Sequence, residues 1–138
     1  MCGREQNGQG QGGATSRRRR AAVWLLPAGW GALVTAFSLI PRAPGPLRPL
    51  LFPGGDKLLH GAAYAVLCGL IVWAVAAGRR WAHLAASGAA AVLFGLAVEC
   101  LQPLTGRTFD WRDLAANVSG VLIALAAAVV TAPRRPGP

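Results

Sequence analysis

The sequence predicts an all-α membrane protein, a bundle of four transmembrane helices whose N- and C-termini both lie in the cytoplasm. Apolar residues make up 54% of the chain and charged residues only 14%, whereas soluble domains average about 45–50% and about 25%. The excess lies in four blocks, each close to the roughly 20 residues that cross the hydrocarbon core of a bilayer. The blocks lack the polar face at helical period that a soluble bundle needs. They are Ala21–Ile40, Leu58–Ala77, Ala82–Leu101 and Leu114–Ala132.

The first block contains no charged residue and follows a polar segment, residues 1–20, that is rich in glycine and ends in four arginines. This composition predicts a disordered, basic cytoplasmic tail. Arginines before an apolar run also occur in signal peptides, but this run exceeds the about 7–15 residues of a signal core, and no A-x-A cleavage site follows. We therefore expect an uncleaved first helix, a membrane domain over residues 21–133 and a second cytoplasmic tail over residues 134–138.

In a soluble protein the net charge of +9 would suggest a nucleic-acid partner. Here the alternation of the helices places almost nothing but arginine on one side of the membrane and a mixed, nearly neutral set of charges on the other. The positive-inside rule makes the arginine-rich side cytoplasmic. We expect a multi-pass protein of the plasma membrane that contacts lipid and binds no nucleic acid. The cytoplasmic set is Arg4, Arg17–Arg20, Arg79, Arg80, Arg134 and Arg135.

Polar residues interrupt the apolar blocks at three places that this topology brings to the outer surface. At about 3.6 residues per turn, each set lies on one face of its helix. The second helix starts with Asp56, Lys57, His60 and Tyr64, the third ends with Glu99 and Gln102 after Gly88 and Gly95, and the fourth starts with Asp110, Asp113, Asn117 and Gly120. Ionisable groups at membrane depth usually face the bundle interior or a wet cavity. We therefore predict that the three stripes line one outward-facing polar pocket.

Some of these residues also have a structural interpretation. Asp56 and Asp110 have the position of helix N-caps, and Tyr64 fits an aromatic belt at the membrane interface. The cations at this surface suit either interfacial anchors or ion-pair partners of the acids: Lys57, Arg107 and Arg112.

His60, Glu99 and Asn117 lie within or at the border of apolar spans, where burial without a partner costs several kcal/mol. One explanation is a set of interhelical hydrogen bonds, each worth only about 0.6–2 kcal/mol. The sequence favours a functional site over a scaffold, because ionisable residues inside a membrane are functional candidates by default. A His/Glu pair also has the chemistry for general acid/base catalysis.

A metal is not predicted. His60, Glu99 and Asp113 are suitable ligand types for a divalent cation, but no H-x-x-x-H or H-E-x-x-H spacing supports one, and no other cofactor is expected. Covalent catalysis is not indicated either, because Ser119 and Cys100 lie away from the polar stripes.

The sequences DKLLHGAAYAVL and GLAVECLQPLTGRTFDWRDLAANVSGVLIA, with the four-helix layout, resemble the VanZ-like family. The family pattern has D-K-x-x-H-x-x-x-Y at the start of one helix and E-x-x-Q at the end of the next. R-x-x-D-x-x-D-x-x-x-N-x-x-G then covers a loop and the following helix start. The agreement of many positions in order makes the resemblance specific. Gly61 departs from the bulky aromatic residue that often follows the histidine, which alters the expected shape of the pocket.

The resemblance implies a small bacterial integral membrane protein of the cell envelope, in a family named after a member linked to teicoplanin resistance, and it implies no particular reaction. We expect the pocket to bind a glycopeptide, a lipid-linked cell-wall precursor or a phospholipid head group. Two alternatives stay open. One is a membrane-embedded enzyme acting on such a lipid with His60 and Glu99 as acid/base groups, and the other is a structural or regulatory subunit of a membrane complex. The predicted ligand-binding residues are Asp56, Lys57, His60, Tyr64, Glu99, Gln102, Arg107, Asp110, Asp113 and Asn117.

Overall fold

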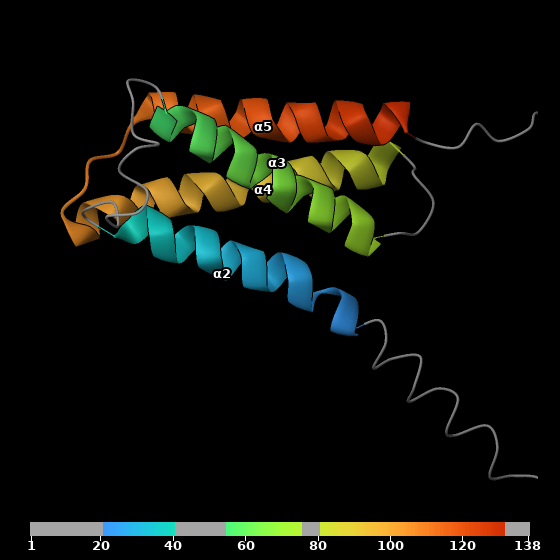
Figure 1. Cartoon of the computed structure of the whole chain (residues 1–138), viewed down its shortest axis with the longest axis horizontal. Coiled ribbons are helices and arrows are strands. Elements are labelled where there is room, and N and C mark those ends of the chain that lie inside the picture. Colours follow the sequence, from blue (N-terminus) through green and yellow to red (C-terminus); the bar gives the residue numbers. More distant parts are fainter. Residues whose placement is uncertain (1–20, 41–54, 76–80, 132–138) are drawn as a thin grey trace, which may run out of the picture.

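The computed structural model describes residues 21–40, 55–75 and 81–131, and these residues form helices and connecting turns without a strand. The elements are α2 (Leu25–Leu39), α3 (Gly55–Val75), α4 (Trp81–Leu101), the 3₁₀ helix η2 (Gln102–Thr105) and α5 (Trp111–Val130). Four helical spans in this part of the chain are long and apolar enough to cross a membrane, which confirms the predicted fold class (Figure 1). The cytoplasmic location of the termini stays a prediction, and the proposed tails 1–20 and 134–138 lie outside the described residues.

The first membrane-spanning segment, Ala21–Leu39, is interrupted near its start. Pro27 has no N–H to donate to the carbonyl four residues before it, and α2 proper begins at Leu25 after a turn at Trp24. The helix buries a narrow face that recurs every three or four residues: Pro27, Gly31, Val34 and Ser38. The indole Nε1 of Trp30 donates a hydrogen bond to the carbonyl of Ala63 in α3, at 2.9 Å. One face of α2 therefore packs on the bundle, and the remainder is available to lipid.

Helices α3 and α5 approach each other more closely than side chains would allow. A Cβ atom added at Gly120 would collide with the carbonyl oxygen of Gly61 and lie 3.1 Å from the nitrogen of Ala65. A Cβ atom added at Gly61 would lie 3.3 Å from the carbonyl oxygen of Ala116. Small residues at such a contact let two helix backbones pack directly. This crossing holds α3 and α5 side by side (Figure 1).

Helix α4 is the most enclosed of the four spans, because small residues run along its inner face. A Cβ atom at Gly88 would lie 2.8 Å from Cδ1 of Leu125 in α5, and one at Gly95 would lie 2.9 Å from Cε1 of Tyr64 in α3. The predicted stripe of Gly88, Gly95, Glu99 and Gln102 is buried throughout, so the predicted packing face of this helix is confirmed.

Large apolar side chains cover the outside of the bundle as well as its centre. The buried core consists of Val34, Tyr64, Leu67, Cys68, Ala91 and Val121. Trp73, Leu93 and Ile123 are among many large apolar residues that are more than half exposed. Exposed apolar surface on this scale marks a membrane or protein interface, which fits helices that face lipid.

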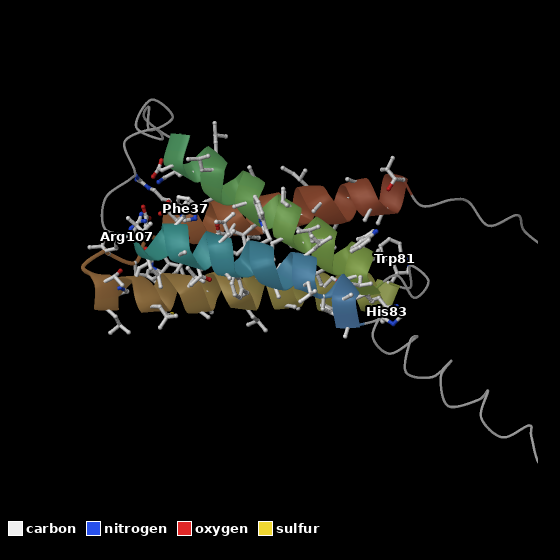
Figure 2. All side chains as sticks on the ribbon, turned by 60° about the horizontal axis from the view of Figure 1, so that its bottom comes forward. Phe37, Trp81, His83 and Arg107 are labelled. Carbon is white, nitrogen blue, oxygen red and sulfur yellow. The ribbon has the colours of Figure 1, made fainter. Side chains whose placement is uncertain are left out.

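The two ends of the bundle differ in character. α2 and α4 end, and α3 and α5 begin, at the same end, where Figure 2 shows Arg107 close to the end of α2. Trp81 and His83 lie at the opposite end (Figure 2). The fold therefore gathers the start of α3, the end of α4 and the start of α5 at one membrane face, as the sequence predicts.

Candidate functional site

The site begins in the first two turns of α3. This helix starts at Gly55, three residues before the apolar block at Leu58, so Asp56 lies inside the first turn and is not the N-cap. A carboxylate in the first turn interacts favourably with the positive end of the helix dipole. The early start also places Lys57 and His60 on the inner side of the helix, where both are only partly exposed.

Lys57 is the centre of an ion-pair cluster. Its Nζ lies 3.0 Å from Oδ1 of Asp113, 3.1 Å from Oδ2 of Asp56 and 3.7 Å from Oδ2 of Asp110. The side chain of Asp113 is 7% exposed, and burial of a carboxylate without a partner would be costly. Lys57 therefore joins α3 to the start of α5 as an ion-pair partner, one of the two roles considered from the sequence.

His60, which belongs to the α3 stripe, contacts both of the other stripes. Its Nδ1 lies 3.2 Å from Oδ1 of Asn117 and 3.9 Å from Oε1 of Glu99. Its Nε2 lies 3.7 Å from Oδ2 of Asp113. One imidazole from α3 is thus within reach of a carboxylate from α4, a carboxylate from α5 and an amide from α5. The predicted convergence of the stripes is confirmed by these distances.

Glu99 near the end of α4 and Gln102 at the start of η2 are both fully buried. The Gln102 amide nitrogen donates to Oε1 of Glu99 at 3.3 Å. When the Gln102 side-chain amide is flipped by 180°, its nitrogen instead donates to Oε2 of Glu99 and to the carbonyl of Thr108, each at 3.2 Å. In either orientation Gln102 holds the Glu99 carboxylate in place, and the second orientation also ties it to the loop before α5.

A tight turn leads the chain from α4 to α5. Gly106 closes η2 with a φ of 79°, a left-handed conformation that costs glycine little and other residues more. The N–H of Arg107 then donates to the carbonyl of Gln102 at 3.2 Å. The turn presents the guanidinium of Arg107 to α2, where its Nη1 donates to the carbonyl of Ser38 at 3.0 Å. Arg107 therefore fastens the end of α2 to this loop.

Asp110 has two roles. It is the N-cap of α5, where its Oδ1 accepts a hydrogen bond from the N–H of Arg112 at 2.8 Å, so the capping interpretation is confirmed for this residue. Its other oxygen is the one that faces Lys57 at 3.7 Å. Because α5 begins at Trp111, three residues before its predicted apolar block, Asp113 falls in the first turn of the helix.

Two buried polar atoms of the described part of the chain have no hydrogen-bond partner: the hydroxyl of Tyr64 and Nδ2 of Asn117. A Cβ atom placed on Gly95 would lie 3.3 Å from Cζ of Tyr64 and 3.3 Å from that Nδ2, so the two groups border the same spot, one turn before Glu99. Leaving a polar group buried and unpaired costs about 1–3 kcal/mol. Tyr64 is 1% exposed, so the aromatic-belt interpretation of this residue is wrong.

The structure also shows contacts around the candidate site that the sequence interpretation missed. The close contact at Gly61, the pairing of Arg107 with a backbone carbonyl and the approach of Thr108 to Gln102 were not expected. The small-residue spacings Gly61-x-x-x-Ala65 and Ala116-x-x-x-Gly120 were the signal that could have identified the crossing. Ser119 is exposed and its Oγ donates to the carbonyl of Ala115 within its own helix, so its expected orientation away from the cluster is confirmed.

The chemistry of the cluster follows from its composition. Within the described residues it combines the four carboxylates of Asp56, Glu99, Asp110 and Asp113 with Lys57, His60 and two side-chain amides. Such a set can hydrogen-bond a polar head group, exchange a proton between imidazole and carboxylate, or coordinate a cation.

Comparison with known proteins identifies a family. The family model described as VanZ/LLP1 matches residues 9–132, which include all four membrane-spanning helices and every residue of the cluster. Neither the comparison with curated proteins nor the comparison with solved structures gave a match.

Proposed function

The chain belongs to the VanZ/LLP1 family of multi-pass membrane proteins, and we propose that it binds the polar head group of a membrane-embedded amphiphile in the cluster around His60. The cluster lies at one end of the bundle, so a ligand whose tail stays in the bilayer would bring its head group to this depth. With the predicted orientation, the site faces outward from the plasma membrane, towards the cell envelope.

The observation that carries this proposal is the pair of unpartnered atoms over Gly95. Most polar side chains of the cluster are tied to one another, but the Tyr64 hydroxyl and the Asn117 amide nitrogen are buried without a partner. Native proteins seldom leave such groups unpaired, and each exception calls for an explanation. Both groups can donate a hydrogen bond, so a ligand oxygen would satisfy them, and the carboxylates beside them would accept from ligand hydroxyl or amine groups.

Three ligand classes carry both kinds of group: phospholipids, lipid-linked cell-wall precursors and glycopeptides such as teicoplanin. The glycopeptide class is included because the family takes its name from a member linked to teicoplanin resistance. The surrounding helices would contact lipid in each case, and binding would require no further cofactor.

The test compares ligand binding by the full chain and by Tyr64→Phe, purified in a mild detergent. The probes are phosphatidylethanolamine, phosphatidylglycerol, a polyprenyl-linked peptidoglycan precursor and teicoplanin, and the readout is the rise in Tm as each probe is titrated. Loss of one hydrogen bond is worth about 1 kcal/mol, so Tyr64→Phe should weaken binding of one probe class about fivefold. Its unliganded Tm should not fall, because the hydroxyl has no partner to lose.

Ser119→Ala is the matched control, because it also removes one hydroxyl but from the exposed face of α5. It should bind every probe like the unmodified chain. Equal affinity of Tyr64→Phe and the unmodified chain for every probe, or no binding of any probe, would overturn the proposal.

A second candidate function is catalysis on the same class of lipid. The contacts of His60 with Glu99 and Asp113, at 3.9 and 3.7 Å, favour it, because histidine and carboxylate side chains are the usual groups for general acid/base proton transfer. A reaction would appear as a change in the mass of a probe lipid after incubation with the protein. His60→Gln should abolish that change while the protein still melts cooperatively.

A further inference from the structure

We propose that His60, Glu99 and Asp113 bind one divalent transition-metal cation, Zn²⁺ or Mn²⁺. Choosing one ligand atom from each residue, the three atoms all lie within 4.8 Å of one another. This inference is independent of the proposed function, because a cation could bind here whether or not a head group does.

The spacing is close to that of a coordination sphere. Ligand atoms bound to one ion at about 2.0–2.2 Å lie roughly 3–4 Å from each other. The 3.7 Å between Nε2 of His60 and Oδ2 of Asp113 already falls in this range, and no two of the three ligand atoms are more than 4.8 Å apart. Small side-chain rotations would therefore complete the site without moving a helix.

The neighbouring residues are arranged as supports for metal ligands. Oδ1 of Asn117 lies 3.2 Å from Nδ1 of His60, so in the tautomer that carries hydrogen on Nδ1 the imidazole donates to the amide. This leaves the lone pair of Nε2 facing Oδ2 of Asp113. Metal-binding histidines almost always donate their second nitrogen to an oxygen in this way. Gln102 holds Glu99 in the same supporting role.

Lys57 leaves one oxygen of Asp113 available. Its Nζ binds Oδ1 of that carboxylate at 3.0 Å, whereas Oδ2 is the oxygen that faces His60. The carboxylate can therefore bridge a lysine and a metal ion at the same time, and the lysine fixes the carboxylate plane.

The charge of the cluster also favours a cation. The ion pairs among the described residues join only two basic side chains, Lys57 and His60, to the four carboxylates. Among these paired groups the carboxylates outnumber the basic side chains, and the guanidinium of Arg107 adds positive charge that acts on Glu99. The repulsion between carboxylates is stronger in a poorly solvated environment than in water, and one divalent ion between Glu99 and Asp113 would relieve it.

The unpartnered groups over Gly95 are a further sign of a ligand. The Tyr64 hydroxyl and the Asn117 amide nitrogen are buried. Their side chains border Gly95, which lies one turn before Glu99 in α4. They can donate to an additional ligand of the ion. One imidazole with two carboxylates suits Zn²⁺ or Mn²⁺ better than the all-oxygen preference of Mg²⁺ or Ca²⁺.

The experiment measures metal binding directly, with no lipid or antibiotic ligand present. The full chain is purified in detergent through a tag without histidines, stripped with a chelator and titrated with Zn²⁺ and with Mn²⁺ by calorimetry. The metal content after dialysis is measured by mass spectrometry. We expect about one ion per chain, and Glu99→Gln or Asp113→Asn should weaken binding at least 100-fold, because even the loss of a supporting group typically costs 10–100-fold.

His83→Gln is the matched control for His60→Gln, which removes the third ligand. The control also removes an imidazole, but from the opposite end of the bundle (Figure 2). It should change the affinity less than about tenfold. If a carboxylate variant does not melt cooperatively, it is replaced by His60→Gln.

Absence of stoichiometric binding by the unmodified chain overturns the metal site, whatever the variants do. Equal weakening by His83→Gln and by His60→Gln overturns it too, since that result would mean only nonspecific binding of the cation to imidazoles. Because no head-group ligand is present in these measurements, either failure leaves the proposed function to its own test.

Discussion

The carbonyl oxygen of Gly61 in α3 lies against Gly120 in α5, so closely that no side chain fits between them. Gly61 directly follows His60, and Gly120 lies less than one turn after Asn117. The backbone contact therefore sets the distance at which His60 and Asn117 meet. In this protein, close packing of two glycines positions the polar cluster.

Gly120→Ala should destabilise the bundle by about 1–3 kcal/mol, because the added methyl group collides with backbone atoms that cannot rotate away. The measurement is the Tm in detergent. Gly69→Ala is the control, since a Cβ atom at Gly69 in α3 would meet nothing within 4 Å. An equal Tm for the two variants would show that α3 and α5 are farther apart than described.

Gly95→Leu should also lower the stability, by about 1–3 kcal/mol. Its Cβ atom would lie 2.9 Å from Cε1 of Tyr64 and 3.3 Å from Nδ2 of Asn117, so the larger side chain would separate α4 from its neighbours. Gly29→Leu in α2 serves as the comparison, because its surroundings are open. Unchanged melting of Gly95→Leu would mean that this face of α4 looks towards lipid.

Arg107→Ala should loosen the end of α2. The variant removes a charged donor that binds the carbonyl of Ser38 at 3.0 Å, a type of hydrogen bond worth about 1.5–3 kcal/mol. We expect a lower Tm and faster hydrogen exchange at the end of α2. Arg112→Ala is the control, because it removes an exposed arginine in the first turn of α5. It should leave the Tm and the hydrogen exchange of α2 unchanged. A similar effect of the two variants would argue against the Arg107 contact.

Thiol labelling of intact cells tests the predicted orientation. The arginine asymmetry places Cys2 in the cytoplasm, and Cys100 is an exposed residue at the end of the bundle predicted to face outward. A membrane-impermeant maleimide should leave Cys2 unmodified until the cells are permeabilised. Labelling of Cys2 before permeabilisation would contradict the predicted orientation and place the N-terminus outside the cell. The buried Cys68 is expected to stay unlabelled throughout.

The sequence predicts those features that depend on local pattern. Four apolar spans and three polar stripes follow from hydropathy and helical period, and the stripes converge because the topology alternates. The predicted starts of α3 and α5 were less accurate. The first turns of these helices contain polar residues, which a search for apolar blocks leaves out. Asp56 was therefore considered as a cap although it lies inside α3.

Features that depend on tertiary contacts were not predictable in the same way. The burial of Tyr64 results from the packing of α3 against α4, and the partner of Arg107 is a backbone carbonyl with no sequence signature. The three ligand candidates His60, Glu99 and Asp113 come from three different helices. No spacing within one segment could therefore indicate that they meet.

The salt bridge between Lys57 and Asp113 joins residues that are 56 positions apart, and this separation has a consequence for biosynthesis. A ribosome delivers α3 to the membrane before it has made α5, so Lys57 and His60 arrive while Asp113 and Asn117 are still untranslated. Until then, water or lipid head groups at the membrane surface have to solvate the first turns of α3. We expect α5 to complete the insertion of α3. In chains stalled before residue 111, the start of α3 should therefore stay accessible to water-soluble reagents.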